Sequence, residues 1–224
     1  MSAMLVDDRA QATRALARSH VYRAAALAFR HPDADALAAL RRLTDAADLA
    51  GWIALPVAEA LGALHRALAD TTVDELRAEH ARTFGHVMLS DCPLYETVGS
   101  GDGDAFRQSQ ALADVAGFYR AFGLDVADDR PDHVSVELEF MHYLAYREAY
   151  AVEHHGPEAV ATLREAQARF VADHLGAWGP ALARAVAERT GGPLAAAAAL
   201  LERCLAAERE LLGLGEPMAQ GGEP

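Results

Sequence analysis

Lysine is absent from this sequence: all 20 basic residues are arginine, and 33 acidic residues oppose them. We attribute the missing lysine to codon bias in an alanine-rich chain and draw no function from it. The net charge of −13 is more informative, because a protein that binds nucleic acid needs a basic face for its phosphate contacts. The charge therefore disfavours nucleic-acid binding and suits a cationic partner.

Cysteine and long apolar runs are also scarce. Cys92 and Cys204 lie far apart without companions at metal-ligand spacing, which disfavours zinc sites and disulfide scaffolds. The longest uncharged run, residues 190–201, is shorter than the roughly 18 residues that a membrane span needs. Residues 1–6 lead directly into Asp7 and leave no apolar signal core. We therefore expect a cytosolic protein without a membrane span.

No useful length of the sequence alternates polar and apolar residues with the period of two that is typical of a β-strand, and this absence predicts an all-α fold. The chain shows no internal repeat and no linker. We expect a single compact multi-helix domain over residues 1–214, with about nine helices around a central buried helix. Residues 215–224 are expected to form a disordered tail. The expected helices span residues 7–30, 33–49, 56–69, 72–84, 105–122, 132–154, 157–176, 180–191 and 193–212.

The segment that begins at Pro131 and Asp132 predicts the central helix. Proline tolerates the first helical turn, and the short carboxylate of Asp132 can cap it. No helix breaker follows before Gly156. A helical projection places one narrow polar strip beside an apolar arc that covers most of the circumference, as is typical of a helix packed on several sides. The strip is Asp132, Ser135, Glu139, His142 and Tyr146, and the arc is Val134, Val136, Leu138, Phe140, Met141, Tyr143, Leu144 and Ala145.

Two ionisable residues, His133 and Glu137, interrupt this apolar arc one helical turn apart. An unpaired charge buried there would cost several kcal/mol. The two side chains are therefore paired with each other, paired with another segment, or exposed in a cleft that admits water or a ligand. A satisfied structural pair and a functional site are both compatible with the sequence.

The longest irregular stretch is residues 85–103. Phe84 precedes it and Tyr95 lies within it. Loops of this length in compact domains are often functional. The alternative is an ordered surface loop whose aromatic residues fill the core. The glycine-rich run at residues 99–103 lacks a phosphate-binding pattern, which disfavours a nucleotide-binding switch.

Catalytic patterns are weak. Glu139 and His142 have the ExxH spacing of di-iron helical bundles, but the chain has no second ExxH, so we interpret them as part of a solvated strip. No serine lies in a nucleophile motif. We expect a protein that is not an enzyme, with no catalytic residues, metal or cofactor. The competing hypothesis is a helical metal-carboxylate enzyme that uses Glu137, Glu139 and His142.

Three segments, in this order and at these separations, resemble the TorD/DmsD/NarJ family of molybdoenzyme maturation chaperones. They are CPLYET at residues 92–97, LADVAGFYRAFG at 112–123 and PDHVSVELEFM at 131–141. The resemblance continues at Phe170, His174 and Trp178 and covers roughly residues 79–178. Among the subgroups of this family, the sequences of these segments are most similar to those of chaperones of type II DMSO-reductase-like enzymes.

The resemblance implies an all-helical, non-catalytic, cytoplasmic chaperone. Such a protein would bind the twin-arginine leader or the apo form of the catalytic subunit of a molybdopterin oxidoreductase. It would support cofactor insertion before export or assembly, as a monomer or a segment-swapped dimer. By position, the family's leader-binding motifs correspond to Phe84, Tyr95, Glu96, Asp132 and His133, to which the residue analysis adds Glu137. We therefore expect the loop at residues 85–103 to lie beside the start of the central helix.

Overall fold

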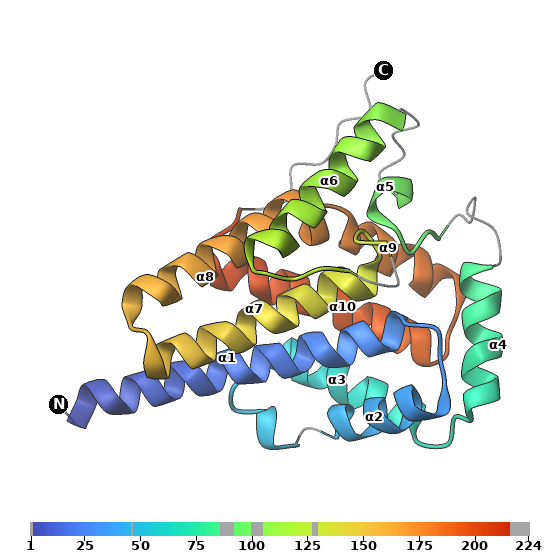
Figure 1. Ribbon diagram of the computed structural model, residues 1–224. Coiled ribbons are helices and arrows are strands. Elements are labelled where there is room, and N and C mark those ends of the chain that lie inside the picture. The colour runs from blue at the N-terminus through green and yellow to red at the C-terminus, as the bar shows by residue number, and fades with distance from the viewer. Residues whose placement is uncertain (1, 46, 86–91, 100–104, 127–129, 216–224) are drawn as a thin grey trace.

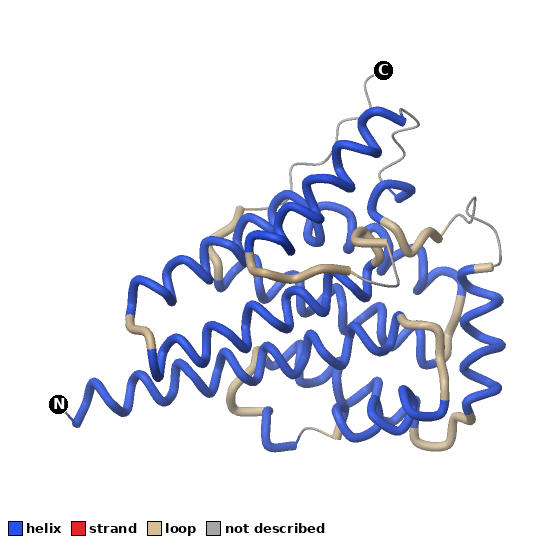
Figure 2. The backbone as a smooth tube through the Cα atoms, viewed as in Figure 1, coloured by secondary structure: helices blue, strands red, loops and turns tan. Residues whose placement is uncertain are grey.

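The structure, a computed structural model, describes residues 2–45, 47–85, 92–99, 105–126 and 130–215. In these ranges the chain forms α-helices joined by short connections and no β-strand, as Figure 2 shows, so the all-α prediction is confirmed. The elements are α1 (Ser2–Phe29), α2 (Ala34–Thr44), the 3-10 turn Ala47–Leu49, α3 (Leu55–Leu68), α4 (Val73–Phe84), α5 (Glu96–Gly99), α6 (Ala105–Ala121), α7 (Val134–His154), α8 (Pro157–Phe170), the π turn Val171–Leu175, α9 (Gly176–Arg189) and α10 (Pro193–Leu211).

The expected central helix is α7, which lies antiparallel to α1 along most of its length (Figure 1). Its apolar side chains are buried: Leu138, Met141 and Leu144 are fully inaccessible to solvent. α8 packs on another side of α7, while α4 crosses the end of the helical layers. Only the outer face of α7, with Tyr146 and Tyr150, is exposed. The prediction of a central buried helix is therefore confirmed.

Helix starts follow local sequence signals closely. α4 begins with a capping box: the Thr72 hydroxyl accepts from the backbone N–H of Glu75 at 3.2 Å, and the Glu75 carboxylate accepts from the backbone N–H of Thr72 at 2.8 Å. Asp33 caps α2 in the same way, through the backbone N–H of Ala36 at 2.7 Å. Pro157 and Pro193 begin α8 and α10 as expected.

Two local expectations were wrong. The N-cap of α7 is His133, whose Nδ1 accepts from the backbone N–H of Ser135, and not Asp132, whose carboxylate is bonded elsewhere. Residues 157–189 form one continuous helical rod through the π turn, without the break expected before Pro180. Buried side chains on the rod, among them Phe170 and Trp178, hold it against the core, and this packing overrides the local tendency of proline to end a helix.

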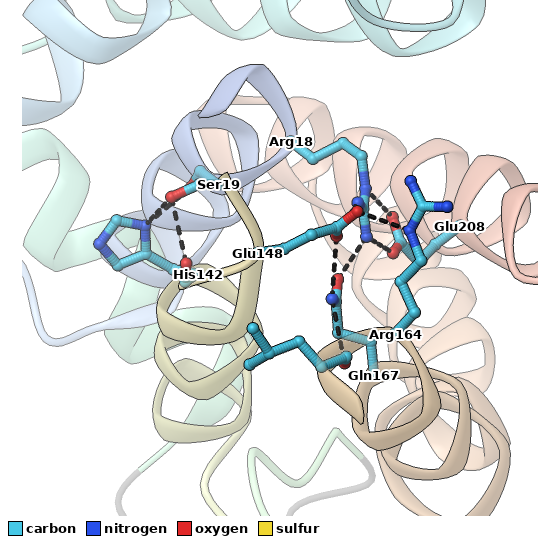
Figure 3. A network of polar contacts seen from close by, with 8 residues as sticks. Arg18, Ser19, His142, Glu148, Arg164, Gln167 and Glu208 are labelled. Atoms are coloured by element: carbon cyan, nitrogen blue, oxygen red, sulfur yellow. Dashed lines mark hydrogen bonds and ion pairs between the residues drawn. The ribbon is translucent and has the colours of Figure 1, made fainter. Parts of the chain in front are cut away.

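A buried polar network joins the four helices α1, α7, α8 and α10 (Figure 3). The Arg18 guanidinium of α1 donates to Glu148 of α7 at 2.8 Å, and also to Gln167 of α8 and Glu208 of α10. Arg164 donates to the other oxygen of Glu148 at 2.7 Å. Because all these groups are hydrogen-bonded and paired in charge, the network can be buried, and it fixes the relative positions of the helices.

In the described ranges, no helix is long and apolar enough to cross a membrane. One continuous hydrophobic cluster draws side chains from α1 through α10, and for this reason we propose that residues 1–214 form one domain. The tail expected over residues 215–224 lies outside the described residues from residue 216 onward.

Candidate functional site

The loop that follows α4 meets the start of α7 through an isolated antiparallel bridge between Tyr95 and His133. The Glu96 N–H donates to the carbonyl of Asp132 at 2.9 Å, and the Val134 N–H donates to the carbonyl of Leu94 at 2.8 Å. The rings of Tyr95 and His133 meet edge to face with centroids 5.0 Å apart. Residues 92–99, the part of the loop that the structure describes, lie beside the start of the central helix as expected, whereas residues 86–91 and 100–104 of the expected loop are outside the described residues. A role of Tyr95 and His133 in binding remains a prediction.

The fully buried carboxylate of Asp132 stabilises this contact between the loop and the start of α7. It accepts from the backbone N–H of Thr97 at 3.2 Å and from the Thr97 hydroxyl at 2.7 Å. The Arg130 guanidinium adds bonds of 2.9 and 2.8 Å to its two oxygens. The same guanidinium lies over the Tyr95 ring, 4.6 Å from its centroid. Asp132 thus holds Arg130 and the loop, and through them orients Tyr95.

A second buried acidic residue, Glu96 at the start of α5, lies in a buried cluster with Glu137, His174 and Trp178. Nδ1 of His174 lies 3.1 Å from one oxygen of Glu96. The Trp178 indole N–H donates to Oε2 of Glu137 at 3.1 Å. Burial, then the neighbouring charge of Glu96, raises the pKa of Glu137 well above its ordinary value.

The state of Glu137 depends on this neighbour. As an ionised group, Glu137 leaves its Oε1 without a hydrogen-bond partner among the described residues. As a protonated acid, it can donate a hydrogen bond to Glu96, which is the contact that raises its pKa further. Two carboxylates in one buried site cannot both ionise cheaply. The buried position of Glu137 therefore favours its protonated form over the ionised form.

His174 occupies the π turn between α8 and α9, and π turns of this kind are frequent at functional sites. Its Nε2 lies 3.4 Å from Oδ2 of Asp114 on α6 but forms no hydrogen bond with any described residue, so we regard this approach as a weak electrostatic contact. Asp114 is exposed, whereas His174 and Glu96 are buried. The cluster thus extends from the surface at α6 to the fully buried Glu137 on α7.

The π turn depends on Gly176, where a Cβ atom would lie 2.3 Å from the carbonyl oxygen of Val171. We expect Gly176→Ala to disrupt the π turn, displace His174 from Glu96 and lower the melting temperature. The matched control is Gly62→Ala in α3, where a Cβ would meet only the flexible end of Arg66 at 3.4 Å. Thermal unfolding of both variants checks this, and equal melting temperatures would contradict the assigned role of Gly176.

Phe84 closes α4 on the His133 side of the junction. Its ring contacts His80 at a centroid distance of 4.7 Å. Burial, then the charges of His31 and His133, lowers the pKa of His80 to about 4.

The structure therefore brings the predicted residues together but buries most of them. Phe84, Glu96, Asp132, His133 and Glu137 are buried, and Tyr95 is half-buried. Sequence reasoning had matched His174 and Trp178 to the family's pattern without assigning them to the site. It did not assign Thr97, Arg130 or Tyr119 to the site, although Thr97 and Tyr119 lie within the segments that resemble the family, because their roles come from contacts across the fold.

An open pocket of about 410 Å³ lies at the start of α7, where Ser135 and Val136 line it. Its apolar wall includes Leu124, Val126, Val136 and Phe140, and its polar groups include Arg23, Arg30, Asp125, Glu139 and His142. Tyr119 also lines the pocket, and its hydroxyl donates to the carbonyl of Pro131 at 2.7 Å. Burial, then the charges of Glu137 and Glu96, raises the pKa of Tyr119.

The competing metal-carboxylate hypothesis requires Glu137, Glu139 and His142 to converge. Instead, Glu137 accepts from Trp178, Glu139 faces Arg23 at 3.5 Å, and Nδ1 of His142 lies 2.7 Å from the Ser19 hydroxyl (Figure 3). In the part of the chain that the structure describes, no three His, Cys, Asp or Glu side chains are grouped to hold a metal ion. The three residues thus have separate roles in the fold.

Comparison with known proteins places these motifs in a family. The chain is similar to a crystal structure from Archaeoglobus fulgidus provisionally described as a redox enzyme maturation protein, at 23% identity and a TM-score of 0.41, covering 66% of this chain and 90% of that chain. Residues 52–184, more than half of the 224-residue chain, match the family described as the nitrate reductase delta subunit. The chain belongs to this family of NarJ/TorD-type redox-enzyme maturation chaperones, as its motifs indicated.

Proposed function

We propose that the protein is a cytoplasmic maturation chaperone for the catalytic subunit of a molybdopterin oxidoreductase. It binds the subunit's twin-arginine leader, or its apo form, and supports cofactor insertion before export or assembly, without catalysing a reaction. The observation that carries the proposal is the bridge between Tyr95 and His133. This bridge joins the family segment at residues 92–97 to the segment at residues 131–141, at the start of the central helix and beside a pocket.

The chemistry of this region suits such a leader, which has a cationic start followed by an apolar segment. The apolar wall of the 410 Å³ pocket, with Val136 and Phe140, can receive the apolar segment. The charges of Glu137 and Glu96 act on Tyr119, which lines the pocket, and the chain carries a net charge of −13. An acidic protein attracts a cationic peptide before contact and orients it.

We expect a leader peptide with a twin-arginine start and an apolar core to bind, and a scrambled peptide of the same composition to bind far more weakly. Apolar burial contributes about 25 cal/mol per Å² and is insensitive to moderate salt. The arginines add a part that salt weakens. Isothermal titration calorimetry at two salt concentrations measures both parts. Equal affinity for leader and scramble would contradict the proposed function.

A further inference from the structure

The outer surface along α1 and α7 carries large apolar side chains that the fold leaves half-exposed. Leu16 of α1 is 45% exposed, and Tyr146 and Tyr150 of α7 are 51% and 46% exposed. Apolar side chains that gather on a surface within a rim of charges are typical of protein interaction sites. The question is therefore which partner this surface fits.

The register of the two helices brings two of these apolar side chains together. Nη1 of Arg23 on α1 lies 3.5 Å from Oε1 of Glu139 on α7. Because the helices run antiparallel (Figure 1), seven residues back along α1 correspond to seven residues forward along α7, a step of about 10.5 Å. This step reaches Leu16 on α1 and Tyr146 on α7, which therefore lie level with each other.

Opposite charges stand at both ends of this apolar centre. A further step of seven residues brings Arg9 of α1 level with Glu153 of α7, as Arg23 is level with Glu139 at the other end. Arg9 is exposed and forms no ion pair with any described residue. The Glu153 carboxylate is 57% exposed and, among the described residues, pairs only with His154 at 3.7 Å. Each end thus presents an arginine on α1 and a glutamate on α7.

We propose that this surface, the α1–α7 seam, binds a second copy of the chain face to face. The seam consists of Arg9, Leu16 and Arg23 on α1 and Glu139, Tyr146 and Glu153 on α7. A two-fold axis parallel to the helices lays α1 of each copy on α7 of the other. Arg9 then meets the second copy's Glu153, and Leu16 meets its Tyr146. At the far end, Arg23 meets the second copy's Glu139.

The charges favour this arrangement over the other two-fold packing of the same face. An axis that runs across the helices would lay Arg9 on the second copy's Arg23 and Glu139 on its Glu153, and like charges in contact are unfavourable. With the axis along the helices, every arginine faces a glutamate, and each contact occurs twice. The seam supplies both halves of the match, which is the argument for a second copy rather than a different protein.

The size of the seam limits the strength of the contact. From Arg9 to Arg23 the seam is about 21 Å long, and two packed helices are about 20 Å wide, which gives roughly 400 Å² per copy. Permanent dimers bury more, and two copies that each carry a charge of −13 repel one another at long range. The dimer is therefore weak and depends on protein concentration, with a dissociation constant of roughly 10–500 µM.

The test is sedimentation equilibrium over a concentration series that spans this range, at about 0.15 M salt to screen the net charge. Wild-type protein should pass from monomer to dimer. Arg9→Glu alone, or Glu153→Arg alone, creates two like-charge contacts in the dimer and should weaken it at least roughly tenfold. Both side chains are exposed, so neither variant should disturb the fold.

Mixing the two charge variants tests the register itself. In a pair made of one Arg9→Glu copy and one Glu153→Arg copy, both contacts again join opposite charges. An equimolar mixture should therefore recover the wild-type degree of association. The mixture carries the same total charge as two wild-type copies, so a change in net charge cannot cause the recovery.

The apolar centre has its own variant and control. Tyr146→Arg places a charge against the second copy's Leu16 and should abolish the dimer. Leu55→Arg adds the same charge at a side chain that is 68% exposed on α3, outside the seam, and should leave the association unchanged.

Self-association and the proposed leader binding share surface, because Arg23 and Glu139 also line the 410 Å³ pocket. A second copy on the seam covers this side of the pocket. A leader peptide that binds should therefore shift wild-type protein from dimer to monomer. A bound leader that leaves the dimer intact would contradict the placement of the second copy on the seam.

The remaining outcomes decide the inference without any leader peptide, so it stands or falls separately from the proposed function. Wild-type protein that stays monomeric throughout the series would overturn it. A dimer that survives in both charge variants, or that is lost equally in Leu55→Arg, would place the contact on another face. Charge variants that are monomeric alone and stay monomeric when mixed would refute the two-fold register.

Discussion

Replacing Arg18 with methionine is expected to lower the free energy of unfolding by about 3–5 kcal/mol, because it leaves two buried carboxylates without their shared cation. Glu148 and Glu208 both bond this guanidinium, and the Arg18 side chain is only 12% exposed. Arg164 still pairs with Glu148 in the variant, but it is half-exposed and forms no ion pair with Glu208 in the described structure. Urea denaturation at neutral pH measures the loss.

Arg23→Met is the matched control for Arg18→Met. Arg23 lies on the same helix, but its side chain is 41% exposed and pairs with Glu139 at 3.5 Å. Exposed pairs of this kind contribute about 0–1 kcal/mol, so the control should unfold close to wild type. Losses of similar size in the two variants would contradict the central role assigned to the network.

Arg18→Met should also change how the free energy of unfolding depends on pH in acid. Burial alone would raise the pKa of Glu148, but Arg18 and the bonds from Gln167 and Arg164 outweigh it and hold that pKa below its ordinary value of 4.5. A lowered folded-state pKa contributes stability above about pH 4.5, and this contribution is lost as pH falls through the folded value. The difference between wild type and Arg18→Met should therefore shrink in acid, as unfolding curves at pH 7 and pH 4 would show.

Asp132→Ala is expected to lower the free energy of unfolding by about 2–3 kcal/mol and to weaken leader binding at least tenfold. This loss is smaller than the roughly 3–5 kcal/mol typical of a broken buried ion pair. The Arg130 side chain is 34% exposed, so water can solvate its guanidinium in the variant. Binding should fall because Asp132 holds Thr97 and Arg130, and Arg130 in turn covers Tyr95. Denaturation and peptide calorimetry on the same preparation measure the two effects.

Asp48→Ala serves as the control, since this exposed acid lies in the 3-10 turn Ala47–Leu49 and does not line the pocket. It should change neither stability nor leader affinity by more than a few tenths of a kcal/mol. The conservative variant Asp132→Asn keeps the shape and should retain part of both functions, with affinity reduced by about 1–3 kcal/mol. Full leader affinity in Asp132→Ala would refute the positioning role of this carboxylate.

The sequence by itself predicted the helical architecture well because its helices are encoded locally. The capping box at Thr72, the prolines that open α8 and α10, and the apolar arc of α7 depend on residues close together in the chain. The motifs around Tyr95 and His133 also identified the family and correctly placed the loop beside α7.

Only the tertiary structure decided which partner each polar side chain takes. Sequence spacing allowed His133 and Glu137 to pair, yet His133 caps α7 and Glu137 meets Trp178, 41 residues away along the chain. Likewise, Arg18 and Glu208 are separated by 190 residues and meet in one buried network. Helical periodicity shows which face is apolar, but a buried charge takes its partner from whatever element packs there, and that choice is fixed by the fold as a whole.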